Sequence, residues 1–130
     1  MNRKLYCRVS HADARGLIAP QIEVARGFFS RLRGLLGRKK LEEGEGLILC
    51  PCSAIHCFGM NFPIDAVFLD SQNQVVGIRE NMAPGSQASN SCAHLVLELN
   101  AGEVLKHRIN NGEELVFSFY PKERKGLQLL

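Results

Sequence analysis

The chain has 130 residues, a net charge of +3 at pH 7, 45% hydrophobic residues and 22% charged residues. This length suits one domain over residues 1–130, and this composition excludes an intrinsically disordered chain. No run approaches the roughly 20 apolar residues that a membrane-spanning helix needs, so we expect no membrane partner.

The first forty residues predict two strands followed by a helix. Apolar and polar residues alternate over residues 4–9, and a second strand is expected over residues 17–25, with Pro20 at an edge or a bend. Apolar side chains then recur at helical spacing over residues 28–36, and Gly37 is placed to end that helix.

The rest of the chain has the short apolar runs of strands, separated by turn residues. Residues 94–99 alternate, with three leucines on one face. Residues 80–90 are rich in Pro, Gly, Ser and Asn and are expected to be a loop, and residues 101–109 are expected to form one or two helical turns. The expected strands span residues 47–50, 64–70, 74–78, 94–99 and 115–119, of which the second and third form a hairpin.

These elements predict a fold class. Seven or eight short strands, one short helix near residues 28–36 and no βαβ alternation indicate a mainly β protein. We expect a single-domain β-sandwich or a partly closed barrel, with residues 121–130 as a frayed tail.

The charge is uneven along the chain. Residues 1–40 hold ten Lys and Arg against two acids, whereas residues 41–130 hold six against eleven. A basic field can steer polyanions, so the basic segment 26–40 is a candidate binder of anionic polymers. Its basic residues are mostly spread singly and no aromatic interleaves the run at residues 38–40, which favours a solvated surface. Nucleic acid is therefore not an expected partner.

The cysteines and the first residues predict a cellular location. The first residues are charged and lack the apolar core of a secretory signal. Five cysteines cannot all pair with one another within one chain. We therefore expect a cytoplasmic protein with reduced thiols.

Residues 50–60, CPCSAIHCFGM, concentrate the groups that can carry chemistry. Thiolate, imidazole and thioether groups together suit Cu(I) or Zn²⁺. The spacing is poor for a structural zinc site, because adjacent His56 and Cys57 point to opposite faces of a strand. We therefore expect no metal and no cofactor, and we expect most of the thiols to fill the core. The ligands of a metal site would come from Cys50, Cys52, His56 and Cys57, with Cys92 and His94 as distal ligands.

A thiol nucleophile is the other chemical hypothesis for this segment. Cys52 could face His56 across a bend, with Asp65 orienting the imidazole. Three such groups within fourteen positions are unusually local for a catalytic triad. No catalytic residue is expected, and a metal- or thiol-dependent enzyme that uses Cys52 and His56 is the alternative.

Three ordered motifs between residues 28 and 78 resemble a known family. GLLGR, PC-x-x-IH-x-F-x-M and FPID-x-VFLD are similar to the bacterial and archaeal family called domain of unknown function 192. The resemblance implies a β-rich sandwich or barrel of jelly-roll type and implies no activity. Cys57 stands where the family usually has a threonine-like residue, which weakens a functional role for it. The residues that match the motifs are Cys52, His56, Phe58, Met60, Pro63, Asp65 and Asp70.

The expected function is that of a small non-enzymatic binding or accessory module with a small-molecule ligand. Asp65 begins an apolar strand, where a buried carboxylate must find hydrogen-bond donors. His56 is the nearest cationic candidate in the sequence, so a structural contact between His56 and Asp65 is the preferred interpretation. The alternative is that the pair lines a small pocket with Met60. The candidate ligand-binding residues are Cys52, His56, Phe58, Met60 and Asp65; the oligomeric state is not predicted.

Overall fold

The computed structural model describes residues 4–27 and 38–121, which form a mainly β fold. Seven strands make one sheet in the order β6-β5-β8-β3-β2-β1-β9, and β4 and β7 make a second, two-stranded sheet. Neighbouring strands are antiparallel except β2 and β3, which are parallel. The elements are β1 (Leu5–His11), β2 (Leu17–Ala25), β3 (Glu45–Leu49), β4 (Ala54–His56), β5 (Ile64–Leu69), β6 (Val75–Met82), β7 (Gln87–Ser89), β8 (Leu95–Asn100), α2 (Glu103–His107) and β9 (Leu115–Pro121).

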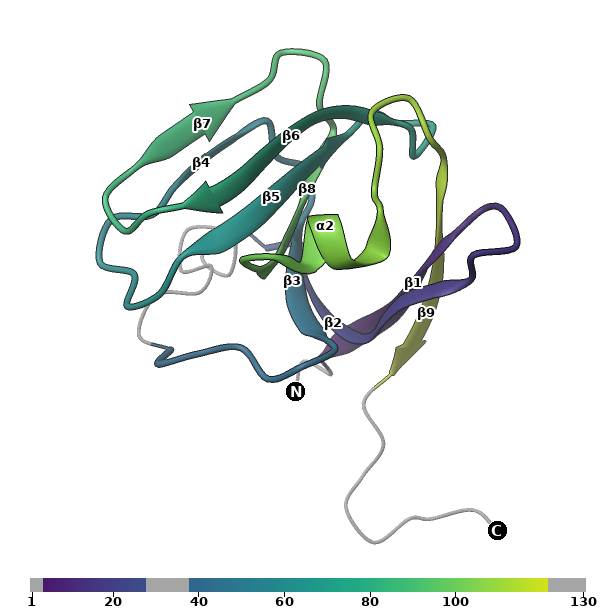
Figure 1. Cartoon of the computed structure of the whole chain (residues 1–130), viewed down its shortest axis with the longest axis horizontal. Helices are drawn as coiled ribbons and strands as arrows, with labels where there is room; N and C mark the ends of the chain where they lie inside the picture. Colours follow the sequence, from purple (N-terminus) through teal and green to yellow (C-terminus); the bar gives the residue numbers. More distant parts are fainter. Residues whose placement is uncertain (1–3, 28–37, 122–130) are drawn as a thin grey trace, which may run out of the picture.

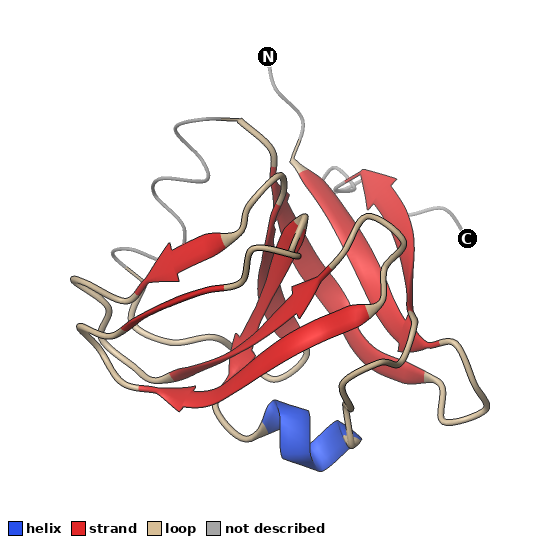
Figure 2. Ribbon diagram, turned by 90° about the horizontal axis from the view of Figure 1, so that it is seen from above, coloured by secondary structure: helices blue, strands red, loops and turns tan. Residues whose placement is uncertain are grey.

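The large sheet is covered on both faces in its middle. Figures 1 and 2 show the sheet curling around α2, with the small β4–β7 sheet packed on the other side of β5 and β8. Strands β5 and β8 are therefore buried on both faces, and every residue of β5 is buried. This double burial explains why β5 is an unbroken apolar run apart from Asp65.

Two hydrophobic cores follow from these layers. The first core lies on the α2 side of the sheet and includes Val104 of α2 and Leu97 of β8. The second core lies between the sheet and the β4–β7 pair and includes Ile55 of β4, Ala88 of β7 and Val96 of β8. Successive residues of β8 thus alternate between the two cores, as the pleat of a strand requires.

A buried hydrogen-bonded pair connects the first strand to the segment between α2 and β9. His11 places its Nδ1 atom 2.6 Å from Oε1 of Glu113, and its Nε2 atom lies 2.8 Å from the carbonyl oxygen of His107. Arg15 also reaches Glu113, at 3.0 Å. The His11 side chain is almost completely buried, so this pair holds the end of α2 against the β1–β2 hairpin.

Most of the predicted fold is confirmed. The mainly β class, the hairpin formed by β5 and β6, and the helical turn near residues 101–109 are all present. The part of the sheet that the structure describes does not close into a barrel, because β6 and β9 each have one neighbour. The helix predicted at residues 28–36 lies outside the described residues, as do most of the basic segment 26–40 and all but the first residue of the tail predicted at residues 121–130.

The loop predicted at residues 80–90 is wrong in part. β6 continues to Met82, and β7 pairs with β4 inside the predicted loop. β7 has three residues, of which only Ala88 is buried. A strand this short has no detectable alternation, and polar residues around it resemble a turn.

Over residues 4–27 and 38–121, no helix is long and apolar enough to cross a membrane.

Candidate functional site

Asp65, the acidic residue of the motif FPID, is completely buried. Its Oδ1 atom accepts a hydrogen bond from the backbone N–H of Asn81 at 2.8 Å. Its Oδ2 atom accepts from the N–H groups of Gly102 and Val104, both at 3.0 Å. These two donors lie at the start of α2, so Asp65 supplies from a distant strand the cap that the helix lacks locally. The need for donors was predicted correctly, and their source was not.

The expected contact between His56 and Asp65 is wrong. The carboxylate is satisfied by backbone N–H groups, and Asp65 points toward α2, on the opposite face of β5 from the second core. His56 is exposed on the small sheet, with its ring centroid 5.4 Å from that of Phe58. The two residues are separated because the side chain of Asp65 points to the α2 face of β5, whereas β4, which carries His56, packs on the opposite face.

The other predicted residues of this segment occupy two environments. Phe58 is 54% exposed, whereas Met60 is buried in the second core. Cys52 is half-buried, and its Sγ atom lies 3.1 Å from the carbonyl oxygen of Ala54. The five candidate ligand-binding residues therefore do not share one surface.

The thiols are also divided between core and surface. Burial raises the pKa of Cys7 to about 12, and burial likewise raises the pKa of Cys57. Cys92 is exposed, and the Sγ atom of Cys50 lies 3.7 Å from Nε2 of His94. Among the described residues, no group of three or more His, Cys, Asp and Glu side chains converges on a point that could hold a metal ion.

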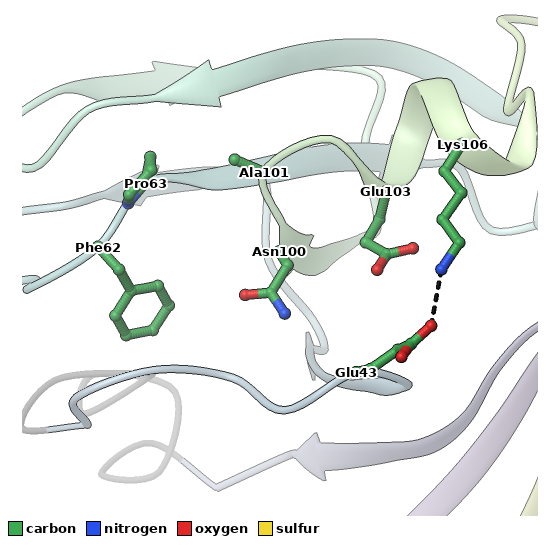
Figure 3. A pocket seen from close by; sticks show the side chains of 7 residues that line it. All are labelled: Glu43, Phe62, Pro63, Asn100, Ala101, Glu103 and Lys106. Atoms are coloured by element: carbon green, nitrogen blue, oxygen red, sulfur yellow. Dashed lines mark hydrogen bonds and ion pairs between the residues drawn. The ribbon is translucent and has the colours of Figure 1, made fainter.

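An open pocket of about 530 Å³ lies at the end of β8, next to the motif FPID. Such a volume is typical of sites for small molecules. Figure 3 shows Phe62 on one side and Glu103 on the other, with Asn100 between them. The lining comes from the segments before β3 and β5, from the end of β8 and from α2: Glu43, Phe62, Pro63, Asn100, Ala101, Glu103 and Lys106.

One ion pair and two further polar contacts hold the polar groups of this open pocket. Lys106 donates from Nζ to Oε1 of Glu43 at 2.8 Å, which closes one end of the pocket (Figure 3). The Asn100 amide donates one of its two N–H bonds to the carbonyl oxygen of Leu41 at 2.8 Å. Glu103 is held by His107 at 2.9 Å.

Asp65 positions this pocket without lining it. Its hydrogen bonds fix the first turn of α2. This helix carries Glu103 at its start and Lys106 three residues later, and both side chains line the pocket. The motif FPID therefore contributes in two ways. Phe62 and Pro63 form part of the wall, and Asp65 holds the opposite wall in place.

Glu98 is a buried carboxyl that the sequence pattern did not reveal. It is 4% exposed, in the middle of β8, between Leu47 of β3 and Ala66 of β5. Two residues from Val96 on the same strand, it projects into the second core. Burial raises the pKa of Glu98 to about 7. The Glu98 charge also adds to the raised pKa of Cys57, after the larger effect of burial.

Two solved structures share this fold. A protein of unknown function from Novosphingobium aromaticivorans DSM 12444 superimposes with a TM-score of 0.74 at 23% identity, covering 84% of this chain and 83% of that one. A putative transcription regulator from Sinorhizobium meliloti 1021 gives a TM-score of 0.76 at 23% identity, covering 89% and 94%. At this identity the likeness shows the fold alone.

A comparison with curated proteins gives no match. The family model DUF192, described as an uncharacterized ACR, matches residues 9–117, which is most of the chain. That span includes all three motifs on which the resemblance was based. The chain belongs to the DUF192 family.

Proposed function

We propose that this protein is a non-enzymatic module that binds a small molecule in the open pocket beside the motif FPID. The observation that carries the proposal is the pocket itself, in which an aromatic side chain and several polar groups from four segments converge. Phe62 supplies a half-buried aromatic ring and Pro63 an apolar ring, and four polar side chains surround them, which suits a polar ligand more than an apolar one.

The lining also indicates the class of ligand. Two carboxylates and one ammonium group leave the pocket with a net negative charge. Asn100 adds an amide oxygen as an acceptor, and one of its two N–H donors is already bonded to the carbonyl oxygen of Leu41. Acceptors therefore outnumber donors, and phosphate groups would meet repulsion. The ligand that fits is neutral or cationic and rich in hydroxyl or amino groups.

The pocket differs from the site that the motif residues suggested. Cys52, His56 and Phe58 do not line it, and Met60 lies in the second core. Asp65 contributes by positioning α2. The proposal keeps the predicted function, a binding module, and assigns the binding to different side chains.

Ligand binding can be tested with three panels of probes at millimolar concentration: monosaccharides and polyols, aliphatic diamines, and inorganic phosphate with nucleotides. A probe that binds only the folded state raises the melting temperature. We expect at least one member of the first two panels to do so and to shift the backbone amide NMR signals of Phe62, Ala101 and Glu103. Phosphate and nucleotides should do neither.

A matched pair of variants localises the binding. Glu103→Gln removes an acceptor charge from the pocket and should weaken binding, whereas Glu80→Gln makes the same change on an exposed part of β6 and should not. The proposal is overturned if neither of the first two panels binds, or if binding is unaffected by Glu103→Gln.

A further inference from the structure

The loops that follow β3 and precede β8 bring a cysteine and a histidine together. The backbone N–H of Cys52 donates to the carbonyl oxygen of His94 at 2.8 Å, and the N–H of His94 donates to Leu69 at 2.7 Å. The N–H of Cys50 donates to Ala25 at 3.1 Å. Backbone hydrogen bonds thus anchor both sides of the pair, and its geometry does not depend on side-chain packing alone.

The two side chains meet at the edge of the first core. Cys50 is half-buried and packs against that core, whereas the His94 side chain is exposed. The Sγ atom of Cys50 lies 3.7 Å from Nε2 of His94, within the range of a hydrogen bond to sulfur. A thiol beside an imidazole can transfer its proton and become a nucleophile, which is the requirement for thiol chemistry.

Three of the other described cysteines supply natural comparisons. Cys7 and Cys57 are buried, and their pKa values are raised by that burial, so neither should react in the folded protein. Cys92 is exposed, two residues before His94. It serves as an accessible thiol in the same molecule.

We propose that Cys50 and His94 form a reactive thiol–imidazole pair whose substrate is a small disulfide. Nε2 of His94 accepts the thiol proton, and the Cys50 sulfur attacks one sulfur atom of the disulfide. The S–S bond of the substrate breaks, and a mixed disulfide with Cys50 forms. The other sulfur leaves as a thiolate and takes a proton from the imidazolium or from water. The cysteine is oxidised while the leaving half is reduced, so no further reactant is needed.

This proposal is independent of the proposed binding function, because the pair shares no residue with the open pocket. It also differs from the thiol hypothesis drawn from the sequence. That hypothesis paired Cys52 with His56, whereas the structure places the imidazole of His94 beside Cys50.

The test uses the full wild-type chain and 4,4′-dithiodipyridine, which releases a coloured thione on exchange. With less than one equivalent of reagent, mass spectrometry of the digested protein identifies the first cysteine to react. We expect that residue to be Cys50, with a rate at pH 7 about tenfold above that of Cys92. Modification of Cys92 or Cys52 ahead of Cys50 would overturn the proposal, and this result requires no variant to fold.

Two histidine variants test the role of the imidazole. In His94→Gln the Cys50 rate should fall about tenfold at pH 7, and its pH–rate profile should move to higher pH, with the Cys92 rate unchanged. His56→Gln alters an exposed histidine elsewhere and should leave both rates unchanged. Circular dichroism and melting temperature confirm that each variant is folded. An unchanged Cys50 rate in folded His94→Gln would refute the pairing.

Discussion

Replacing Glu98 with glutamine should make the protein more stable at neutral and alkaline pH and should change the pH dependence of its stability. The carboxyl is buried in the second core, and its pKa is about 7 in the folded protein against an ordinary 4.5. The unfolded chain therefore releases this proton near pH 4.5, whereas the folded chain holds it until about pH 7. The stabilising contribution of the bound proton is complete below pH 4.5 and is lost as the pH rises through 7.

The magnitude follows from the two pKa values. Each pKa unit corresponds to 1.36 kcal/mol, so a rise from 4.5 to about 7 corresponds to about 3 kcal/mol of stability lost between these pH values. Glutamine has nearly the same shape and does not ionise. The difference in free energy of unfolding, Glu98→Gln minus wild type, should therefore increase by about 3 kcal/mol between pH 4 and pH 8.

Urea unfolding at a series of pH values measures this difference directly. All other titrating groups are common to both proteins, so their contributions cancel in the subtraction. Glu80→Gln is the matched control, because Glu80 is exposed on β6, and its difference from wild type should stay flat. A flat difference for Glu98→Gln over the same pH range would refute the reasoning, whatever the sign of its average.

Three further substitutions test the contacts that hold the layers together. Asp65→Asn should lower the free energy of unfolding in urea by about 3 kcal/mol, because the amide sets N–H donors against backbone donors; a loss below about 1 kcal/mol would contradict this. His11→Ala should cost about 3 kcal/mol by the same assay, since it removes the buried partner of Glu113, whereas His56→Ala at the surface should change stability by less than about 0.5 kcal/mol; equal effects would contradict the assignment. Gly46→Ala should cost about 2 kcal/mol in thermal or urea unfolding, because its Cβ would lie 2.6 Å from a backbone oxygen of β8; an unchanged midpoint would show that the strands can separate to admit it.

Much of the fold could be predicted because its strands carry strong local signals. The apolar run of β5 and the turn after it predict a hairpin without knowledge of distant residues. β4 and β7 have three residues each and depend on pairing with one another for their existence. A strand that forms mainly because it pairs with a segment about thirty residues away is difficult to predict from its own few residues.

The two buried carboxyl groups, Asp65 and Glu98, were harder to predict than the strands, because the environment of each depends on long-range packing. Asp65 finds its donors in α2, almost forty residues later. Apolar and polar residues alternate around Glu98, and this pattern usually indicates a strand with one face exposed to solvent. In this protein the β4–β7 sheet covers the face, so a residue that resembled a surface glutamate lies in the core.

The pairing of β1 with β9 has a consequence for synthesis on the ribosome. Leu5 and Pro121 are register partners, although more than a hundred positions separate them. A nascent chain therefore displays the unpaired edge of its first strand until its last described strand has left the exit tunnel. Domains dominated by contacts between distant positions fold more slowly than domains with local contacts, commonly in milliseconds to seconds. A protein truncated before Leu115 would lack β9, so the edge of β1 would stay unpaired. We expect such a protein to aggregate or to be degraded by proteases.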